Sequence, residues 1–136
     1  MKLEFVSPER MIAHEEVDEV QLPGEEGFLG VLPGHTPMLV ALKVGPMWYR
    51  KGTEKFFGFV GFGFAEILPD RVTILARIAE KADDIDLARA EAAKHRAEEN
   101  LAQVARGGNE MDYERARLAL LRAITRLQVS QHARRR

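Results

Sequence analysis

The sequence predicts an N-terminal antiparallel β-sandwich followed by a C-terminal antiparallel two-helix hairpin, and three observations lead to this fold class. The composition of the 136-residue chain changes sharply near Ala82, since all six prolines, all seven phenylalanines and the single tryptophan come before it. Short apolar runs separated by turn residues fill the part before Ala82, which is typical of antiparallel sheets. Apolar residues at helical spacing fill the part after it. We therefore expect a β-sandwich domain over 1–82 and an α-helical hairpin over 83–136.

Each expected strand is an apolar or alternating run that ends at glycine, proline or another turn residue. In chain order the runs are 3–6, 16–22, 28–32, 38–42, 47–50, 55–60, 64–68 and 72–76. Lys51-Gly52-Thr53 and Pro69-Asp70 are tight-turn signals between neighbouring runs. Gly58, Gly61 and Gly63 lack the order of a dinucleotide-binding loop, so we interpret them as a strand that passes close to another backbone.

The two helices follow from capping residues and periodicity. Asp83 or Asp84 can cap the first helix, Gly107-Gly108 ends it, and the short connection folds the second helix back. One apolar stripe runs along each helix: Leu87, Ala90, Ala93, Ala97, Leu101 and Val104, then Tyr113, Ala116, Leu120, Ile124 and Leu127. Because many of these residues are alanines, which bury little area, we expect the hairpin to dock weakly and conditionally on the sandwich.

Charge and composition argue against several classes of function. The net charge of -1 provides no basic field for nucleic acid. The absence of cysteine removes disulfides, thiol catalysis and thiolate zinc sites, and the four histidines lack metal-ligand spacing. No Ser-His-Asp, phosphate-loop or paired-carboxylate arrangement indicates an enzyme. Met1–Phe5 has no apolar signal core, and no apolar run is long enough to cross a bilayer, so membrane association is expected only through a partner.

Arginines on the helices give the best local signal. Asp86 and Arg89 are three residues apart on one helix face, so their side chains can pair, and Arg96 lies two turns beyond Arg89 on that face. A second set shares one face of the other helix: Arg115, Arg122 and Arg126. A hairpin could gather these guanidinium groups beside a carboxylate, which suits a phosphate-bearing ligand because arginine binds phosphate oxygens bidentately. Spacing alone, however, favours a solvated arginine face on a surface hairpin.

Several segments resemble, in order and spacing, the epsilon subunit of bacterial rotary (F-type) ATP synthase. They are Val6–Arg10, Glu16–Val20, Gly30–Pro37, Gly63–Glu66, Val72–Ala76 and Ala79–Ala90. Two motifs within them are uncommon: Pro-Gly-His-Thr-Pro at 33–37 and Ile-Asp-x-x-Arg-Ala at 85–90. The resemblance covers nearly the whole chain and implies the same fold class, a β-sandwich followed by a two-helix hairpin.

The resemblance implies a non-catalytic subunit of the proton-translocating ATP synthase. Such a subunit lies on the central stalk, where its sandwich holds the gamma subunit and rests on the ring of c subunits. It couples rotation, driven by the transmembrane proton gradient, to ATP synthesis from ADP, and its hairpin inhibits ATP hydrolysis when it extends into the alpha/beta catalytic head. The implied location is peripheral, on the cytoplasmic side of the bacterial cell membrane.

The resemblance also implies a regulatory ATP site, with no cofactor required. The positions that match the nucleotide site of binding relatives are Glu80, Ile85, Asp86, Arg89, Ala90, Arg96, Arg122 and Arg126. Phe28 stands where several relatives carry an acid in the loop that faces the c-ring, so this contact is either more apolar here or made by Glu25 and Glu26. His35 is interpreted as a turn residue or an interface contact.

The second helix is densely positive. The arginines that make it so are Arg115, Arg117, Arg122, Arg126 and Arg134–Arg136. Such a helix is poorly suited to bury itself fully against its own sandwich, since each desolvated arginine needs a partner. It suits an acidic cleft, which the resemblance supplies in the catalytic beta subunits, and we expect Arg115 to be a partner contact there.

Two other classes of function remain. A free ATP-binding sensor or scaffold module would use the same helices without a stalk, and a stand-alone enzyme would need a catalytic constellation that the sequence lacks. Co-purification with gamma separates the stalk subunit from both.

Overall fold

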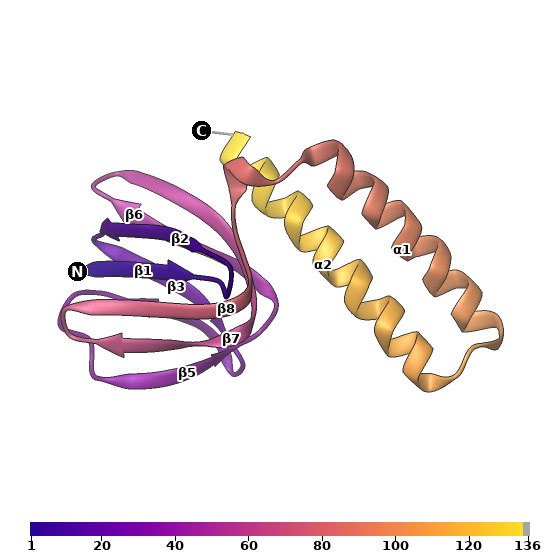
Figure 1. The fold of residues 1–136 in the computed structure, drawn as a ribbon, viewed down its shortest axis with the longest axis horizontal. Coiled ribbons are helices and arrows are strands. Elements are labelled where there is room, and N and C mark those ends of the chain that lie inside the picture. Colours follow the sequence, from indigo (N-terminus) through magenta and orange to yellow (C-terminus); the bar gives the residue numbers. More distant parts are fainter. Residues whose placement is uncertain (135–136) are drawn as a thin grey trace.

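The computed structural model describes residues 1–134, with side chains up to residue 132. Arg135 and Arg136, which belong to the expected C-terminal basic cluster, lie outside the described residues, as does the side chain of Arg134. Figure 1 shows the strands gathered in one body and the two helices projecting from one end of it as a hairpin. The strands are β1 Lys2–Val6, β2 Met11–Glu16, β3 Glu19–Gly24, β4 Gly27–Val31, β5 Met38–Leu42, β6 Gly45–Lys51, β7 Glu54–Leu68 and β8 Arg71–Lys81. A 3-10 helix η1, Ala82–Asp84, leads into the helices α1, Leu87–Gly107, and α2, Glu110–Arg134.

The strands hydrogen-bond in the order β2-β1-β8-β7-β5-β3-β4, and β6 pairs with both β3 and β7. The 15-residue β7 serves both layers of the sandwich, since β6 pairs with its first part and β5 with its second part. Phe62, with a φ of 57°, lies between these two parts. The expected fold class is confirmed, with one departure: β1 pairs with β8 in parallel, from Lys2 opposite Arg71 to Val6 opposite Leu75. Both strands therefore run in the same direction, and β8 continues from Ala76 to Lys81 beyond the end of β1.

Two expected strand boundaries were wrong. The runs 55–60 and 64–68 form the single strand β7, because the glycines between them allow the strand to bend while it stays close to β8. A Cβ on Gly63 would overlap the carbonyl oxygen of Leu75, and one on Gly58 would lie 2.9 Å from the carbonyl oxygen of Glu80. The expected close approach of backbones is thus confirmed.

The run 16–22 is also not one strand. The chain turns at Val17 and Asp18, whose backbone N–H groups donate to the carbonyl oxygens of Met1 and Arg50. Val17 therefore leaves the sheet between β2 and β3. Strand β2 was missed because its sequence, MIAHEE, has no regular apolar alternation and pairs at the sheet edge with β1.

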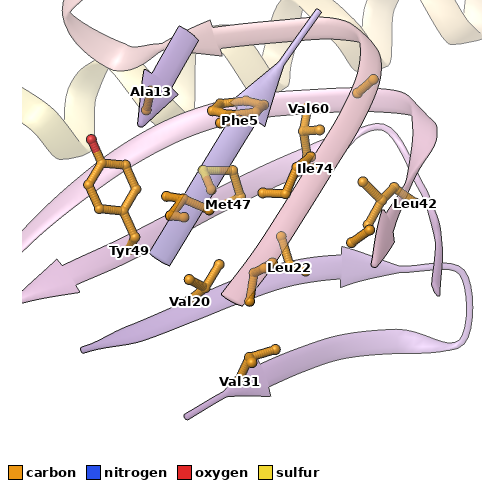
Figure 2. Close-up of a cluster of buried hydrophobic side chains, with 14 of the residues drawn as sticks. Phe5, Ala13, Val20, Leu22, Val31, Leu42, Met47, Tyr49, Val60 and Ile74 are labelled. Carbon is orange, nitrogen blue, oxygen red and sulfur yellow. The ribbon is translucent and has the colours of Figure 1, made fainter. Parts of the chain in front are cut away.

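The core lies between the layers of the sandwich (Figure 2). Leu3 and Phe5 of β1, Val20 of β3 and Ile74 of β8 are fully buried. Each such side chain contributes about 1.5–3 kcal/mol through the area it removes from water. A smaller cluster joins the hairpin to the sandwich, and it consists of Phe59, Ala82, Ile85, Ala90, Leu127 and Val129.

The hairpin buries much less than the sandwich. In α1 only Ala90 and Ala97 are buried, and the first stripe otherwise lies half-buried against α2. The C-terminal half of α2 packs on β6, β7 and η1, whereas α1 packs chiefly on α2. Tyr113 does not belong to the second stripe, since it is 42% exposed near the tip of the hairpin. Neither helix within residues 1–134 has both the length and the apolar character needed to cross a membrane.

Candidate functional site

A pocket of about 520 Å³ lies where the end of β8, η1 and both helices meet. Seven of the eight residues expected to bind ATP line it, and they come from β8, the segment before α1, and the two helices: Glu80, Ile85, Asp86, Arg89, Ala90, Arg96 and Arg126. Arg10, Asp84 and Ala93 complete the lining. The hairpin thus does gather arginines beside carboxylates, as their spacing allowed.

The Ile-Asp-x-x-Arg-Ala motif builds the floor of this pocket. Asp86 is the N-cap of α1, and its Oδ1 accepts a hydrogen bond of 3.1 Å from the backbone N–H of Arg89. The cap is therefore neither Asp83 nor Asp84, both of which lie in η1, one turn too early. Ile85 and Ala90 are buried in the cluster that joins hairpin and sandwich. The Ile, Asp and Ala positions of the motif thus have structural roles at the start of the helix, where free N–H groups and the helix dipole also favour anions.

The Asp86 carboxylate was expected to pair with the Arg89 side chain. This was wrong, because the carboxylate accepts from the backbone N–H of Arg89 instead. Among the described residues, the guanidinium groups of Arg89 and Arg96 therefore both lack an ion pair. Both side chains are exposed at the pocket. Two cations are therefore available to an anionic ligand.

Arg126 is held in place by a forked contact. Its Nε and Nη2 donate to Oε1 and Oε2 of Glu80 over 3.0 and 3.2 Å, and its guanidinium lies 5.1 Å from the centre of the Phe59 ring. Both charged side chains are about one-third exposed, at 32% and 34%. This contact joins α2 to β8 and occupies the Nε and Nη2 fork of Arg126, so only its remaining N–H groups are available to a ligand, and Glu80 offsets part of its charge.

Arg122 does not line this pocket. It lies one turn before Arg126 on α2 and faces an adjoining pocket of about 400 Å³ between the helices, which shares Ala93, Arg96 and Arg126 with the first. Because the helices are antiparallel, one turn along α2 moves a side chain away from η1 and toward the tip of the hairpin. The expected set of eight is therefore divided between two adjoining spaces.

Arg10 and Asp84 were not expected in the site. Arg10 Nη2 lies 3.8 Å from Asp84 Oδ2 across the mouth of the pocket. They come together because β1 and β8 run parallel, so the turn after β1 and the part of β8 beyond Leu75 that leads into η1 leave the pairing in the same direction. No local pattern in the sequence indicates that parallel pairing. Within residues 1–134, no three His, Cys, Asp or Glu side chains gather so as to hold a metal ion.

The three expected partner contacts all lie outside the pocket. Phe28 is 62% exposed at a shallow groove that Glu25 and Glu26 also line. His35 is held in a turn, where its Nδ1 lies 2.7 Å from the carbonyl oxygen of Thr36. Arg115 is exposed near the tip of the hairpin, in a groove with Arg122. His35 is thus confirmed as a turn residue, and the three partner contacts stay predictions.

Comparison with known proteins gives consistent matches over both parts of the chain. Residues 1–82 match the model of the ATP synthase delta/epsilon chain β-sandwich domain, and residues 83–131 match that of the delta/epsilon long α-helix domain. The chain is 48% identical to the ATP synthase epsilon chain of Syntrophobacter fumaroxidans, with 96% of each chain covered. It is 46% identical to ATP synthase epsilon chain 2 of Syntrophotalea carbinolica, with 96% of this chain and 93% of the relative covered.

A solved structure supports the fold. A chain of the Euglena gracilis mitochondrial ATP synthase, in a complex described as OSCP/F1/c-ring in rotational state 1, superposes with a TM-score of 0.74 at 21% identity. The match covers 98% of this chain and 80% of that one. The sandwich, the hairpin and the full-length relatives agree, and this chain belongs to the family of ATP synthase delta/epsilon chains.

Proposed function

We propose that this protein is a non-catalytic central-stalk subunit of a proton-translocating ATP synthase, which couples rotation to ATP synthesis and inhibits ATP hydrolysis through its C-terminal helices. One observation carries the proposal: a sandwich with a fully buried core bears a hairpin that contacts it only at its base (Figure 1). A stalk subunit needs a stable part that stays with the rotor, and a regulatory subunit needs a part that can leave its docked position. The relatives named ATP synthase epsilon chain, matched along nearly their whole length, support this assignment.

The sandwich is the part proposed to bind gamma and rest on the c-ring. It carries exposed apolar side chains, among them Phe28 at 62%, Leu39 at 70% and Phe64 at 55%. Phe28 and Leu39 line the same groove, and exposed apolar side chains that gather on one surface favour a protein interface. The protein would then lie on the cytoplasmic side of the bacterial membrane and contact it only through the complex, and the chain's net charge gives no reason to expect a nucleic-acid partner.

The second helix is the proposed inhibitory element. Arg115 and Arg117 are exposed, and Arg117 forms only a surface pair of 3.2 Å with Glu114 three residues before it. Such pairs contribute little to stability, so these charges can be transferred to an acidic cleft in the alpha/beta head at low cost. An extended hairpin would then block hydrolysis more than synthesis.

ATP is proposed as a regulatory ligand of the docked hairpin. The pocket at the base of the hairpin presents Arg89, Arg96 and Arg126 from two helices, and arginine forks match phosphate oxygens. A ligand that binds only the docked state stabilises it in proportion to its concentration relative to its Kd. ATP would then favour the docked, non-inhibitory state.

Truncation of the subunit in the assembled ATP synthase tests the inhibitory role. We expect removal of the chain after Ala82 to raise the rate of ATP hydrolysis, and Arg115→Ala with Arg117→Ala, which removes the exposed charges proposed to enter the acidic cleft, to raise it in part. The effect of the arginines should weaken at high salt, because screening weakens exposed charge contacts. A hydrolysis rate that truncation leaves unchanged at both low and high salt would contradict an inhibitory hairpin.

A free ATP-binding sensor or scaffold is the second candidate, since the pocket is complete within one chain. It predicts ATP binding without a stalk partner. Co-purification of the full chain with gamma from cells that express both distinguishes the two, because only the stalk subunit binds gamma.

A further inference from the structure

We propose that Arg10, on the turn after β1, binds the phosphates of a nucleotide in the pocket, and that Asp84 competes with those phosphates for it. The proposal rests on the ATP site proposed above and adds to it a residue of the sandwich. Among the residues that line the pocket, Arg10 is the only cation supplied by the sandwich, because Arg89, Arg96 and Arg126 all belong to the hairpin.

The backbone of Arg10 is fixed, although its side chain is 63% exposed. The Ser7 N–H donates to the Arg10 carbonyl oxygen over 3.0 Å, and the Arg10 N–H donates to Ser7 Oγ over 3.3 Å. Ser7 itself is 9% exposed at the end of β1. The turn therefore holds the Arg10 Cα at the rim of the pocket and leaves the guanidinium free to reorient.

The contact of Arg10 with Asp84 is weak and easily exchanged. The distance of 3.8 Å from Nη2 to Oδ2 exceeds that of a charge-assisted hydrogen bond, and the Asp84 side chain is 53% exposed. Exposed pairs of this kind contribute little. A phosphate group can offer the guanidinium two oxygens at hydrogen-bond distance, whereas Asp84 reaches it through one oxygen at 3.8 Å, so the phosphate should displace the carboxylate.

Because Arg10 belongs to the sandwich, its contact with a phosphate would affect the docking of the hairpin. A phosphate held between Arg10 and the arginines of α1 and α2 joins the sandwich to the hairpin directly. Because a ligand shifts a conformational equilibrium only through its different affinities for the two states, a contact that exists only when the hairpin is docked strengthens the effect of ATP on docking. Asp84 sets the size of this effect, since it places a negative charge beside the incoming phosphate.

Calorimetric titration of the full-length chain tests the proposal, with ATP and inorganic triphosphate as probes. Arg10→Ala should weaken ATP binding about tenfold, as expected for a lost charge-assisted contact. Asp84→Asn should have the opposite effect and tighten binding several-fold. Inorganic triphosphate should show the same order of variants, because the contact is made to phosphate and not to the adenosine.

Arg71→Ala is the matched control for net charge. Arg71 is an exposed arginine at the start of β8, opposite Lys2 and so at the other end of the parallel pair from Arg10. It should leave both affinities unchanged. Circular dichroism and thermal unfolding without ligand check that each variant folds.

The outcomes separate the two proposals. If the unaltered chain and Asp84→Asn both fail to bind ATP, the ATP site and the role of Arg10 are both overturned. If the unaltered chain binds ATP, Arg89→Ala weakens binding and Arg10→Ala does not, only the role of Arg10 is overturned. If Asp84→Asn weakens binding as Arg10→Ala does, the pair serves only to fix the turn, and the proposal is also wrong.

Discussion

The sandwich and the hairpin use apolar residues in different ways, and the difference explains which part holds the structure and which part responds. In the sandwich, large side chains such as Phe5 of β1, Leu22 of β3 and Ile74 of β8 are fully buried in the core (Figure 2). In α1 the only buried residues are Ala90 and Ala97, which remove little area from water. Free energies of local opening follow such differences in packing. The sandwich should therefore stay folded while the hairpin undocks.

The junction between the two parts is small and mixed in character. Leu127 and Val129 of α2 pack on Phe59 of β7, and the forked pair of Arg126 and Glu80 lies beside them. Helices that pack through alanine alone are marginal, so this junction decides whether the hairpin is docked. A ligand at the junction has the greatest influence on that balance.

The largest expected difference between the sandwich and the hairpin is in the thermal unfolding of the two parts as separate fragments. We expect a fragment of residues 1–82 to unfold in a single cooperative thermal transition, although it exposes Phe59 and part of the apolar junction. A fragment of residues 83–136 should lack such a transition and show low helicity, because it loses the surface on which α2 packs. Circular dichroism during heating measures both. A sandwich fragment without a cooperative transition, or a hairpin fragment with one, contradicts the comparison.

Truncating one apolar side chain in each part should lower the free energy of unfolding more in the sandwich than in the hairpin. Phe5→Ala should lower the free energy of unfolding by about 3–5 kcal/mol, as expected for a fully buried phenylalanine. Leu101→Ala, at a half-buried position on α1, should cost about 1 kcal/mol or less. Denaturant titration of both variants provides the values. Equal losses would mean that the hairpin carries as much of the stability as the sandwich.

Acid should weaken the sandwich through one contact between its layers. A hydrogen bond with the Tyr49 hydroxyl lowers the pKa of Glu15 below its ordinary value of 4.5. Partial burial opposes this shift, and the hydrogen bond and charge of Lys51 add to it. This stabilisation is complete above the unfolded pKa and is lost as the pH falls through the lower folded pKa. Tyr49→Phe should therefore reduce stability at pH 7, by about 1 kcal/mol or less, and the deficit should shrink as the pH falls below 4.5.

In the unaltered chain the Tyr49 ring stacks on Phe56 with 5.2 Å between the ring centroids. Tyr49→Phe keeps this ring, so the two proteins differ in the hydroxyl and not in the packing. Denaturant titration of both proteins across this pH range provides the comparison. A deficit that does not change with pH would show that the hydroxyl acts without Glu15.

The sequence predicted what depends on neighbouring residues and missed what depends on distant ones. Turn residues such as Gly52 and Pro69 marked the hairpins between strands, and the glycines at 107 and 108 marked the end of α1. Strand β2 was missed because its pattern is irregular at the sheet edge. The motif residues of the pocket are close in sequence, so the resemblance could place them.

Arg10 shows why the rest of the site could not be predicted. It reaches the pocket because β1 pairs in parallel with β8, and nothing in either strand specifies that partner. Arg122 was expected beside Arg126 because they are one turn apart, but the junction turns only the second toward η1. Periodicity places a side chain on a face of its own helix, and only packing decides what that face meets.

The central claim, that the hairpin responds while the sandwich holds, is tested most directly by amide hydrogen exchange of the full chain with and without ATP. ATP at 100 times its Kd stabilises the docked state by about 2.7 kcal/mol. Exchange should therefore slow at the start of α1 and along residues 122–130 of α2, while the amides of the sandwich core stay unchanged. Arg96→Ala, at an exposed side chain of the pocket, should abolish the slowing without altering the sandwich. Slowing spread evenly over both parts, or absent from the hairpin, would contradict the account.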